Sequence, residues 1–536
     1  MKKIIILLFL FVVFSGMAQE KEQCRLFTDR DLYTSGETIL FKLFVPEETI
    51  SNVIKIDLID TNGKIISAVN REIKDHQAHG FLLLPDSLRT GSYLLCASTQ
   101  KNGETTVNEL FVCNRFTGLV ETPVISIVQS SKLLNEYLAD GMKIDGLKQT
   151  YHKREIAKSL LRFSPELLTQ IKEPLFVTVA EIIPEFIGRS FLIDANPKDD
   201  RSSGSGGIVL DGIATNANTG VPFENATIFM SVPDSIPRLD YYITGKDGYF
   251  SFQLKNYYGK IPVIIQGFDP GKKQLLKIRL NRTDSLNNLV PTFVTKAFTD
   301  AFRRIASDAM ETTMLRKIYN SQEHLINTPV SIKSNEYPFY GIATEVVYPS
   351  LFIDLNDFTE ISRELLPGVK FRAINRIPTL NILNPATLNY FSDQPLVVLD
   401  GIPVFDLNVI KNLGSEEIQR IEICRKERFY GDLVFAGVVA IFTKQPDYTR
   451  LRNSDDLIKL EMNAMQPDLA LIHNSGLKLN EPDLRKVLLW NPNLKSGEDI
   501  EVNFVTSDVH GEYRLIVRGK TKNGPIIYKE QTFSVK

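Results

Sequence analysis

The sequence predicts a mainly β protein, built as a string of β-sandwich domains with one small α+β domain and one helical segment. Short runs of apolar and β-branched residues recur along the chain, such as Thr38-Ile-Leu-Phe-Lys-Leu-Phe-Val and Val53-Ile-Lys-Ile-Asp-Leu-Ile. Turn signals such as Thr61-Asn-Gly and Lys101-Asn-Gly separate these runs, and Asn-Gly strongly favours a hairpin turn. A spacing of about 8–12 residues between turns is typical of β-sandwiches.

Length and composition set the outer limits. A chain of 536 residues predicts about three to five domains at about 100–200 residues each. A hydrophobic content of 43% is enough for packed cores and excludes general disorder. The net charge of −2 provides no basic excess to neutralise phosphates, so nucleic acid is excluded as a partner class.

The first residues have the pattern of an export signal. Lys2 and Lys3 precede an apolar run from Ile4 to Phe14, and Ser15-Gly-Met-Ala then offers a small-residue cleavage site. The apolar run is too short to span a bilayer, and no later stretch reaches 18 uninterrupted apolar residues. We therefore expect residues 1–18 to be a removed signal peptide, the chain to be exported, and the mature protein to contain no transmembrane segment.

The first two predicted sandwiches resemble a known family. Residues 20–116 contain Thr28-Asp-Arg-Asp-Leu-Tyr-Thr-Ser-Gly-Glu-Thr-Ile-Leu-Phe-Lys and Leu84-Pro-Asp-Ser-Leu-Arg-Thr-Gly-Ser-Tyr, and they are similar to a macroglobulin-like domain of the α2-macroglobulin superfamily. In that family a proline usually precedes the glycine, where this chain has Ser35. Residues 118–195 resemble a second, more degenerate domain of the same kind. The polar, Gly/Ser-rich residues 196–206 predict a linker.

A compact all-β unit is predicted next, over residues 207–282. Thr219-Gly-Val-Pro-Phe-Glu-Asn-Ala and Thr244-Gly-Lys-Asp-Gly-Tyr-Phe-Ser-Phe resemble the carboxypeptidase regulatory-like, transthyretin-like sandwich. Asp247-Gly248 predicts a turn, after which Phe250 and Phe252 point to one face.

Residues 293–325 interrupt the β pattern. Phe298, Phe302, Ile305, Ala309 and Met314 recur near helical spacing, which predicts one amphipathic helix. We expect its charged residues to form a solvated face.

Four motifs in one order make residues 360–446 the most informative stretch. The first motif contains Asp400, Gly401 and Pro403, and the second contains Ile421 and Glu422. The third contains Tyr430 and Gly431, and the last contains Gly437 and Thr443. This order resembles the plug domain of TonB-dependent outer-membrane receptors, with a short helical segment from Val409 to Leu413. The resemblance implies a small α+β fold.

Residues 455–536 return to a sandwich pattern, and they look like a macroglobulin-like or Ig-like closing domain. Trp490, the only tryptophan, is expected in its core.

No set of residues predicts catalysis, a metal site or a cofactor. The pair His152 and Glu155 has the spacing of zinc-carboxypeptidase ligands, but a catalytic zinc needs three protein ligands and no third one follows. His76 and His79 have no cysteine or carboxylate partners. Cys24 follows a glutamine, whereas a macroglobulin thioester has the order Cys-x-x-Gln, so a covalent trap is disfavoured. No nucleophile elbow, P-loop or dinucleotide fingerprint occurs.

Cys96 and Cys113 lie on two adjacent predicted strands. They either form a disulfide in an oxidising periplasm or remain free buried thiols.

The function expected is binding. A TonB-dependent receptor needs about 22 further strands to close its barrel, but only about 90 residues follow Thr443. The modules together resemble Bacteroidota envelope proteins, which implies a scaffold or accessory protein that binds outer-membrane or exported proteins, including a TonB-dependent barrel. Two alternatives stay open, namely a ligand-binding accessory of a TonB-dependent uptake system and a macroglobulin-like protease trap without a thioester. The location is periplasmic, outer-membrane associated or at the cell surface, which the sequence leaves open.

Overall fold

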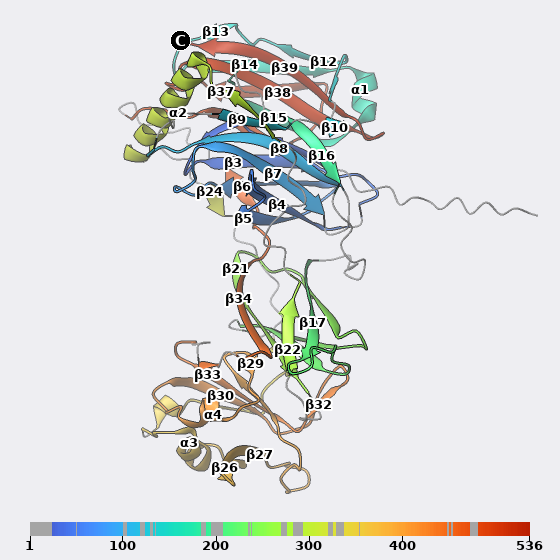
Figure 1. The fold of residues 1–536 in the computed structure, drawn as a ribbon, viewed down its shortest axis with the longest axis vertical. Helices are drawn as coiled ribbons and strands as arrows, with labels where there is room; N and C mark the ends of the chain where they lie inside the picture. Colours follow the sequence, from blue (N-terminus) through green and yellow to red (C-terminus); the bar gives the residue numbers. More distant parts are fainter. Residues whose placement is uncertain are drawn as a thin grey trace, which may run out of the picture.

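The computed structural model confirms a mainly β protein made of sandwiches. Two sandwiches form an upper block, and a third sandwich and an α+β domain form a lower block, with a narrow connection between them (Figure 1). The structure describes residues 24–536 apart from 50, 100–103, 118–123, 129–131, 134–135, 184–188, 195–206, 234–235, 237, 270–275, 282–292, 320–324, 328–336, 353, 447–449, 452–453 and 472–480. The predicted signal peptide and the predicted linker 196–206 therefore lie outside the described residues.

The first sandwich contains strands from the predicted residues 20–116 and also two strands, β10 and β16, that come after residue 116. One sheet has the order β1-β3-β6, with β1 (Arg25–Thr28), β3 (Thr38–Phe44) and β6 (Gln77–Leu83). The other has the order β10-β16-β8-β7-β4-β5, with β10 (Lys132–Leu133), β16 (Ser190–Asp194), β8 (Glu104–Cys113), β7 (Gly91–Thr99), β4 (Val53–Asp60), β5 (Ile65–Glu72) and, parallel to β8, β2 (Leu32–Thr34).

Strand β3 is almost continuously apolar because both of its faces are covered. Side chains alternate across a strand, so Ile39 and Phe41 point into the core of the first sandwich. Leu40 and Phe44 point the other way, into a cluster that contains Trp490 of the second sandwich. Trp490 is only 4% exposed, so its predicted burial is confirmed, but it lies in the contact between two sandwiches and not in the core of one. The two sandwiches thus share a buried contact across β3.

The second sandwich corrects the predicted domain boundaries. Residues 118–195 and 455–536 do not form separate sandwiches, because their strands complete one another around a single core. One sheet combines β11 (Tyr137–Leu138), β39 (Ile526–Val535), β38 (Gly511–Thr521), β15 (Ile171–Glu181) and β36 (Val487–Leu494), with β13 (Thr150–Tyr151) on β39. The other combines β12 (Met142–Asp145), β14 (Ile156–Phe163) and β37 (Asp499–Val505), and α1 (Pro165–Gln170) follows β14.

The third sandwich also needs a distant strand. One sheet has the order β20-β17-β22, with β20 (Tyr249–Leu254), β17 (Ile208–Asn216) and β22 (Leu276–Leu280). The other has the order β19-β18-β21-β34, with β19 (Arg238–Ile243), β18 (Thr227–Val232), β21 (Lys260–Phe268) and β34 (Leu457–Asn463). Since β34 comes from residues assigned to the closing domain, 207–282 is not a complete unit. Phe250 and Phe252 both lie in this core, as predicted.

The plug-like domain is a five-stranded sheet with helices. Its order is β25-β30-β33-β28-β29, with β25 (Glu345–Val347), β30 (Ile418–Cys424), β33 (Val438–Thr443), β28 (Leu396–Leu399) and β29 (Ile402–Pro403). It therefore starts before residue 360. Two hairpins and three helical elements complete it, namely β26 (Val369–Ile374) with β27 (Ile377–Ile382), β31 (Arg428–Tyr430) with β32 (Leu433–Phe435), η3 (Pro349–Leu351), α3 (Phe358–Leu365) and α4 (Asn408–Lys411).

The predicted helix is α2 (Asp300–Ile318), which lies against the upper block (Figure 1). Phe302 and Met310 pack on Phe111 and Leu32 of the first sandwich. Two details of the prediction are wrong, because Met314 is 40% exposed while the charged Arg316 is buried. The strands on either side of α2 in the sequence each pair with a distant strand: β23 (Phe293–Ala297) with β9 (Val124–Val128), and β24 (Leu325–Asn327) with β35 (Leu469–Leu471).

A buried carboxylate explains why the charged side chain of Arg316 is buried. The Glu37 carboxylate lies 3.4 Å from Arg316, 3.4 Å from Lys486 and 3.5 Å from Arg30. Burial alone would raise the pKa of Glu37, but these positive charges outweigh it and hold that pKa well below its usual range. Glu37, which belongs to the macroglobulin-like run that begins at Thr28, therefore forms the centre of an ion cluster that joins the first sandwich, α2 and the second sandwich.

The connection between the two blocks includes polar contacts. The Gln466 side chain accepts a hydrogen bond from Phe81 N (3.1 Å) and donates one to Phe81 O (2.9 Å), so it extends β6 as a strand would. Arg71 donates to Asp468 (2.7 Å). These bonds fix the chain where it passes from β34 back to the upper block.

Candidate functional site

The structure brings the plug-like motif residues together in one sheet. Asp400 and Gly401 form the turn between β28 and β29, with φ of +49° and +87°. The Asp400 carboxylate accepts hydrogen bonds from the Thr443 backbone N–H and hydroxyl, both at 2.7 Å. The first and last motifs are therefore linked directly, and their role here is to close the sheet.

The central motif residues serve the two faces of this sheet. Ile421 is fully buried in the main core of the domain. Glu422 points to the opposite face, where it accepts hydrogen bonds from the Tyr340 hydroxyl and from Arg420, both at 2.7 Å. Gly437 has φ of +91°, and a Cβ there would lie 2.7 Å from the carbonyl oxygen of Cys424.

The remaining motif residues contact the third sandwich. Pro403 O accepts a hydrogen bond from the buried Gln266 side chain (3.1 Å), and the Tyr430 hydroxyl donates to Leu239 O. At Gly431 a Cβ would lie 2.1 Å from the Tyr241 hydroxyl. This face of the plug-like domain is therefore occupied by the third sandwich of the same chain.

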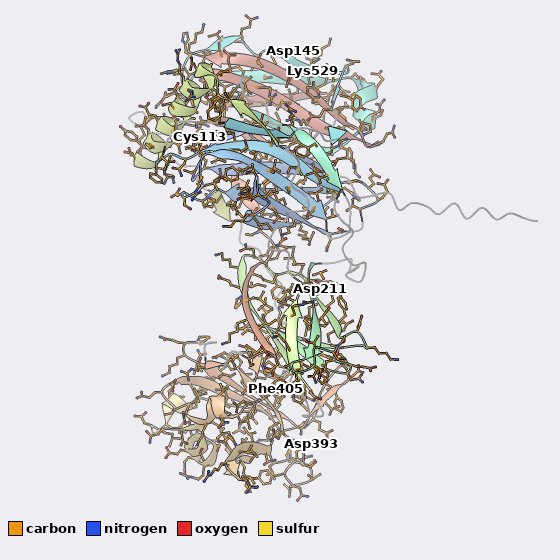
Figure 2. All side chains as sticks on the ribbon, in the orientation of Figure 1. Cys113, Asp145, Asp211, Asp393, Phe405 and Lys529 are labelled. Atoms are coloured by element: carbon orange, nitrogen blue, oxygen red, sulfur yellow. The ribbon has the colours of Figure 1, made fainter. Side chains whose placement is uncertain are left out.

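Aromatic side chains reinforce the joint between the two lower domains. Phe405, labelled in Figure 2, follows β29 and stacks on Phe268 with ring centroids 4.7 Å apart. A second ring, Phe229, lies 5.6 Å away. Ile264 and Ile402 share a small buried cluster beside these rings. The two domains thus form one lower block.

One border of the plug-like sheet remains open. Strand β25 pairs with β30 on one side, and no strand of the described chain pairs with its other side. Exposed large apolar side chains line this border before, within and after β25. We call them the edge surface, and they are Ile342 (65% exposed), Val346 (44%), Tyr348 (47%), Leu351 (77%) and Phe352 (59%).

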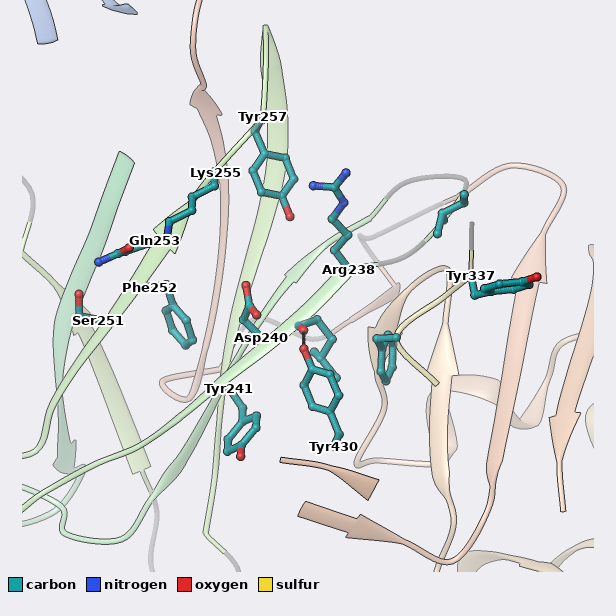
Figure 3. A pocket seen from close by; sticks show the side chains of 13 residues that line it. Arg238, Asp240, Tyr241, Ser251, Phe252, Gln253, Lys255, Tyr257, Tyr337 and Tyr430 are labelled. Atoms are coloured by element: carbon teal, nitrogen blue, oxygen red, sulfur yellow. Dashed lines mark hydrogen bonds between the residues drawn. The ribbon is translucent and has the colours of Figure 1, made fainter. Parts of the chain in front are cut away.

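A cavity of about 540 Å³ lies between the third sandwich and the plug-like domain (Figure 3). Its aromatic lining comes from β19, β20 and the residues after β20, and from two segments of the plug-like domain. The aromatic residues are Tyr241, Phe252, Tyr257, Tyr337, Phe339 and Tyr430. The polar residues are Arg238, Asp240, Ser251, Gln253 and Lys255.

Two cavity residues have altered acid–base behaviour. Partial burial raises the pKa of Asp240, since it disfavours the charged carboxylate, although the residue remains exposed. Burial, with the nearby Asp240 charge, raises the pKa of Tyr430 to about 12. Tyr430 is therefore a neutral hydrogen-bond donor near pH 7.

The residues weighed for metal binding have other roles. Glu155 accepts a hydrogen bond from the His152 backbone N–H (2.8 Å) and pairs with Lys148 (2.6 Å). Burial, with the nearby Lys42 charge, lowers the pKa of His79 to about 4. Within the described residues, no group of three or more histidine, cysteine or acidic side chains has the arrangement of a metal site.

Cys96 and Cys113 are both buried free thiols, so the disulfide alternative is not formed. In the β7–β8 ladder Cys96 lies opposite Val107, which places Cys113 farther along β8. Cys113 packs against α2 while Cys96 packs on Phe191.

Sequence reasoning missed the edge surface and the cavity. The edge surface residues come from a short segment without a motif, and the cavity residues come from two domains. Only the density of tyrosine and phenylalanine around 241–258 and 337–340 signals the cavity in the sequence. The described chain has no helix long and apolar enough to span a membrane.

Comparison with known proteins finds structural neighbours only. No family model and no curated protein matches the chain. Among solved structures, trypsin-activated α2-macroglobulin from Escherichia coli is 12% identical, with 96% of this chain and 23% of that chain covered and a TM-score of 0.16. The elastase-activated form is 10% identical, with 96% of this chain and 44% of that chain covered and a TM-score of 0.24. Dimeric latent PorU from Porphyromonas gingivalis is 10% identical, with 49% of this chain and 34% of that chain covered and a TM-score of 0.17. The chain spans less than half the length of these macroglobulin chains, and scores this low carry no argument about function.

Proposed function

We propose that this chain is a non-enzymatic scaffold or accessory protein of the cell envelope, which binds an outer-membrane or exported protein through the edge surface. The observation that carries the proposal is the open border at β25 with its apolar side chains. An unpaired strand edge presents backbone donors and acceptors to a partner strand. Grouped apolar side chains at such a border are typical of protein interaction sites.

Specific features favour this border over the rest of the domain. The opposite border of the sheet ends in β29, whose Pro403 carbonyl already binds Gln266 of the third sandwich. The β31–β32 hairpin also contacts that sandwich, through Tyr430. Strand β25 is therefore the border of this sheet that a strand of another protein can extend. The plug-like motif order supports a TonB-dependent barrel as one candidate partner.

The experiment is co-purification from native cells. A tagged full-length chain, extracted with gentle detergent, should recover outer-membrane proteins, and Val346→Lys should abolish that recovery by adding a charge at the edge. Val221→Lys is the matched control, because Val221 is also exposed (60%) but lies on the third sandwich. Recovery as a free soluble monomer, or equal recovery with V346K, would contradict the proposal.

A second candidate is a ligand-binding accessory of a TonB-dependent uptake system. The aromatic cavity favours this candidate, because ligand sites are concave and combine aromatic walls with a few polar groups. The third candidate, a protease trap, needs an exposed bait segment. The sequence offers only the linker 196–206 for that role, and this linker lies outside the described residues.

A further inference from the structure

The aromatic cavity has a smaller neighbour. A second cavity of about 200 Å³ shares Phe339 and Tyr430 as walls with the first, and it extends toward Phe429 and Phe435 of the β31–β32 hairpin. The larger cavity, at about 540 Å³, lies within the range of about 300–1,000 Å³ that is typical of small-molecule sites. Together they favour an elongated ligand of a few rings.

The rings are held in place by their own contacts. Tyr241 and Tyr430 have centroids 5.7 Å apart, and Phe339 lies 5.7 Å from Tyr430. On the far side, the Arg238 guanidinium lies 4.9 Å from the Tyr257 ring centroid. The aromatic walls therefore come from both domains and are fixed before a ligand enters.

Polar groups of both hydrogen-bonding kinds lie between these rings. In Figure 3 the Asp240 side chain lies near the middle, with Arg238 and Tyr257 to one side and Tyr430 to the other. Asp240 accepts hydrogen bonds and Arg238 donates them. Gln253, farther along β20, does both. Such a set matches a ligand with many hydroxyl groups, which also donate and accept.

Other ligand classes fit less well. A peptide strand cannot extend β19 here, because the outward carbonyl of Leu239 already accepts the Tyr430 hydroxyl and the Asp432 N–H donates to the Tyr241 hydroxyl (2.8 Å). A polyphosphate would meet the Asp240 carboxylate at the centre of the cavity. A wholly apolar ligand would leave the polar groups without partners, which costs free energy.

We propose that the cavity between the third sandwich and the plug-like domain binds a short oligosaccharide. The C–H faces of the sugar rings stack on tyrosine and phenylalanine rings, while Asp240, Arg238 and Gln253 hydrogen-bond the hydroxyls. The hydrogen-bonding residues Asp240, Arg238 and Gln253 lie outside the edge surface, and the oligosaccharide proposal does not depend on the protein-binding proposal.

The test uses the purified full chain and a panel of tetrasaccharides, namely maltotetraose, cellotetraose, xylotetraose, mannotetraose, chitotetraose and tetragalacturonic acid. Isothermal titration calorimetry should show binding of at least one of them. Tyr257→Ala and Asp240→Asn should each weaken that binding at least tenfold. Gln253→Ala is a third cavity variant, and it leaves the buried core intact because Gln253 is exposed.

Matched controls separate a site effect from a fold effect. Tyr137→Ala and Asp393→Asn change exposed residues outside the cavity and should keep full affinity. V346K should also bind the saccharide normally, whereas Y257A should still recover outer-membrane proteins, so that failure of one proposal is distinct from failure of the other. No binding of any panel member at millimolar concentration, or unchanged binding in all three cavity variants, would overturn the oligosaccharide proposal.

Discussion

The Lys486 ammonium lies 3.4 Å from the Glu37 carboxylate, although 449 residues separate them in the chain. Both side chains are only 3% exposed. Lys486 also donates to the Ala309 carbonyl of α2 at 3.2 Å. The start of β36 is thereby fixed to the first sandwich and to α2, so that the upper block is one unit built from three distant parts of the sequence.

Replacing Glu37 with glutamine should weaken the whole upper block. The substitution leaves Lys486, Arg316 and Arg30 buried without their shared anion. Loss of one partner of a buried ion pair costs about 3–5 kcal/mol, and we expect the free energy of unfolding to fall by that amount. Urea unfolding followed by fluorescence measures it, because the only tryptophan, Trp490, lies between the two upper sandwiches. Glu47→Gln, at the exposed pair with Lys172, should leave the midpoint unchanged; an equal shift in both variants would contradict the account.

The upper block should lose stability in mild acid because of His79. Its pKa is lowered to about 4 by burial and by Lys42, which lies directly opposite it in the β3–β6 ladder. As the pH falls from about 6.5 to about 4, the unfolded chain binds a proton that folded His79 does not. The stabilisation is therefore present above pH 6.5 and lost toward pH 4, by up to about 3 kcal/mol. His79→Gln should flatten unfolding free energy across this range, while His510→Gln, at an exposed site, should keep the slope.

The Asp400–Thr443 link should govern local opening of the plug-like sheet. Asp400→Ala removes the acceptor of both 2.7 Å hydrogen bonds and places a residue with a Cβ but no polar group at φ of +49°. We expect a loss of about 2–3 kcal/mol, seen as faster hydrogen exchange at the Thr443 amide. Asp400→Asn keeps one acceptor oxygen and tolerates this backbone, so its effect should be smaller. Equal protection in D400A and the unaltered chain would show that the link is dispensable.

Phe405 should hold the two lower domains together. Phe405→Ala removes the stack on Phe268, which is worth about 0.5–1.5 kcal/mol beyond the area it buries. Small-angle X-ray scattering should report a larger radius of gyration in F405A. Phe116→Ala, at an exposed phenylalanine of the upper block (68%), should leave the radius unchanged. An unaltered radius in F405A would mean that the Gln266–Pro403 bond and the neighbouring apolar cluster suffice.

Local patterns in the sequence predict much of the fold. The apolar run at Thr38 gives β3, the run at Val53 gives β4, and the motif order gives the Asp400 turn and its sheet. These features depend on neighbours in sequence, where side-chain alternation and turn chemistry act directly.

The choice of strand partner could not be predicted in the same way. Strands β14 and β37 each alternate between buried and exposed residues, and such a pattern is satisfied by any sheet that covers one face. Nothing in either pattern states that they pair with each other across about 340 residues. For this reason the sequence predicts two separate sandwiches, at 118–195 and 455–536, where the structure has one.

The candidate sites are difficult to predict because they depend on exposure and on neighbours from other domains. Leu351 and Phe352 would ordinarily be placed in a core, and only the absence of a covering element among the described residues leaves them on the surface. Tyr257 and Tyr430 come from different domains and meet the same cavity only after the lower block has formed. Arg316 likewise resembles a solvated helix residue until Glu37 is placed beside it.

Site-specific photo-crosslinking in living cells tests the central claim most directly. A photoreactive residue at position 346 of the edge surface should crosslink to an outer-membrane or exported protein. The same residue at position 221, which is also exposed, should give no crosslink to that protein. Crosslinks of equal yield from both positions, or none from position 346, would contradict binding through the edge surface.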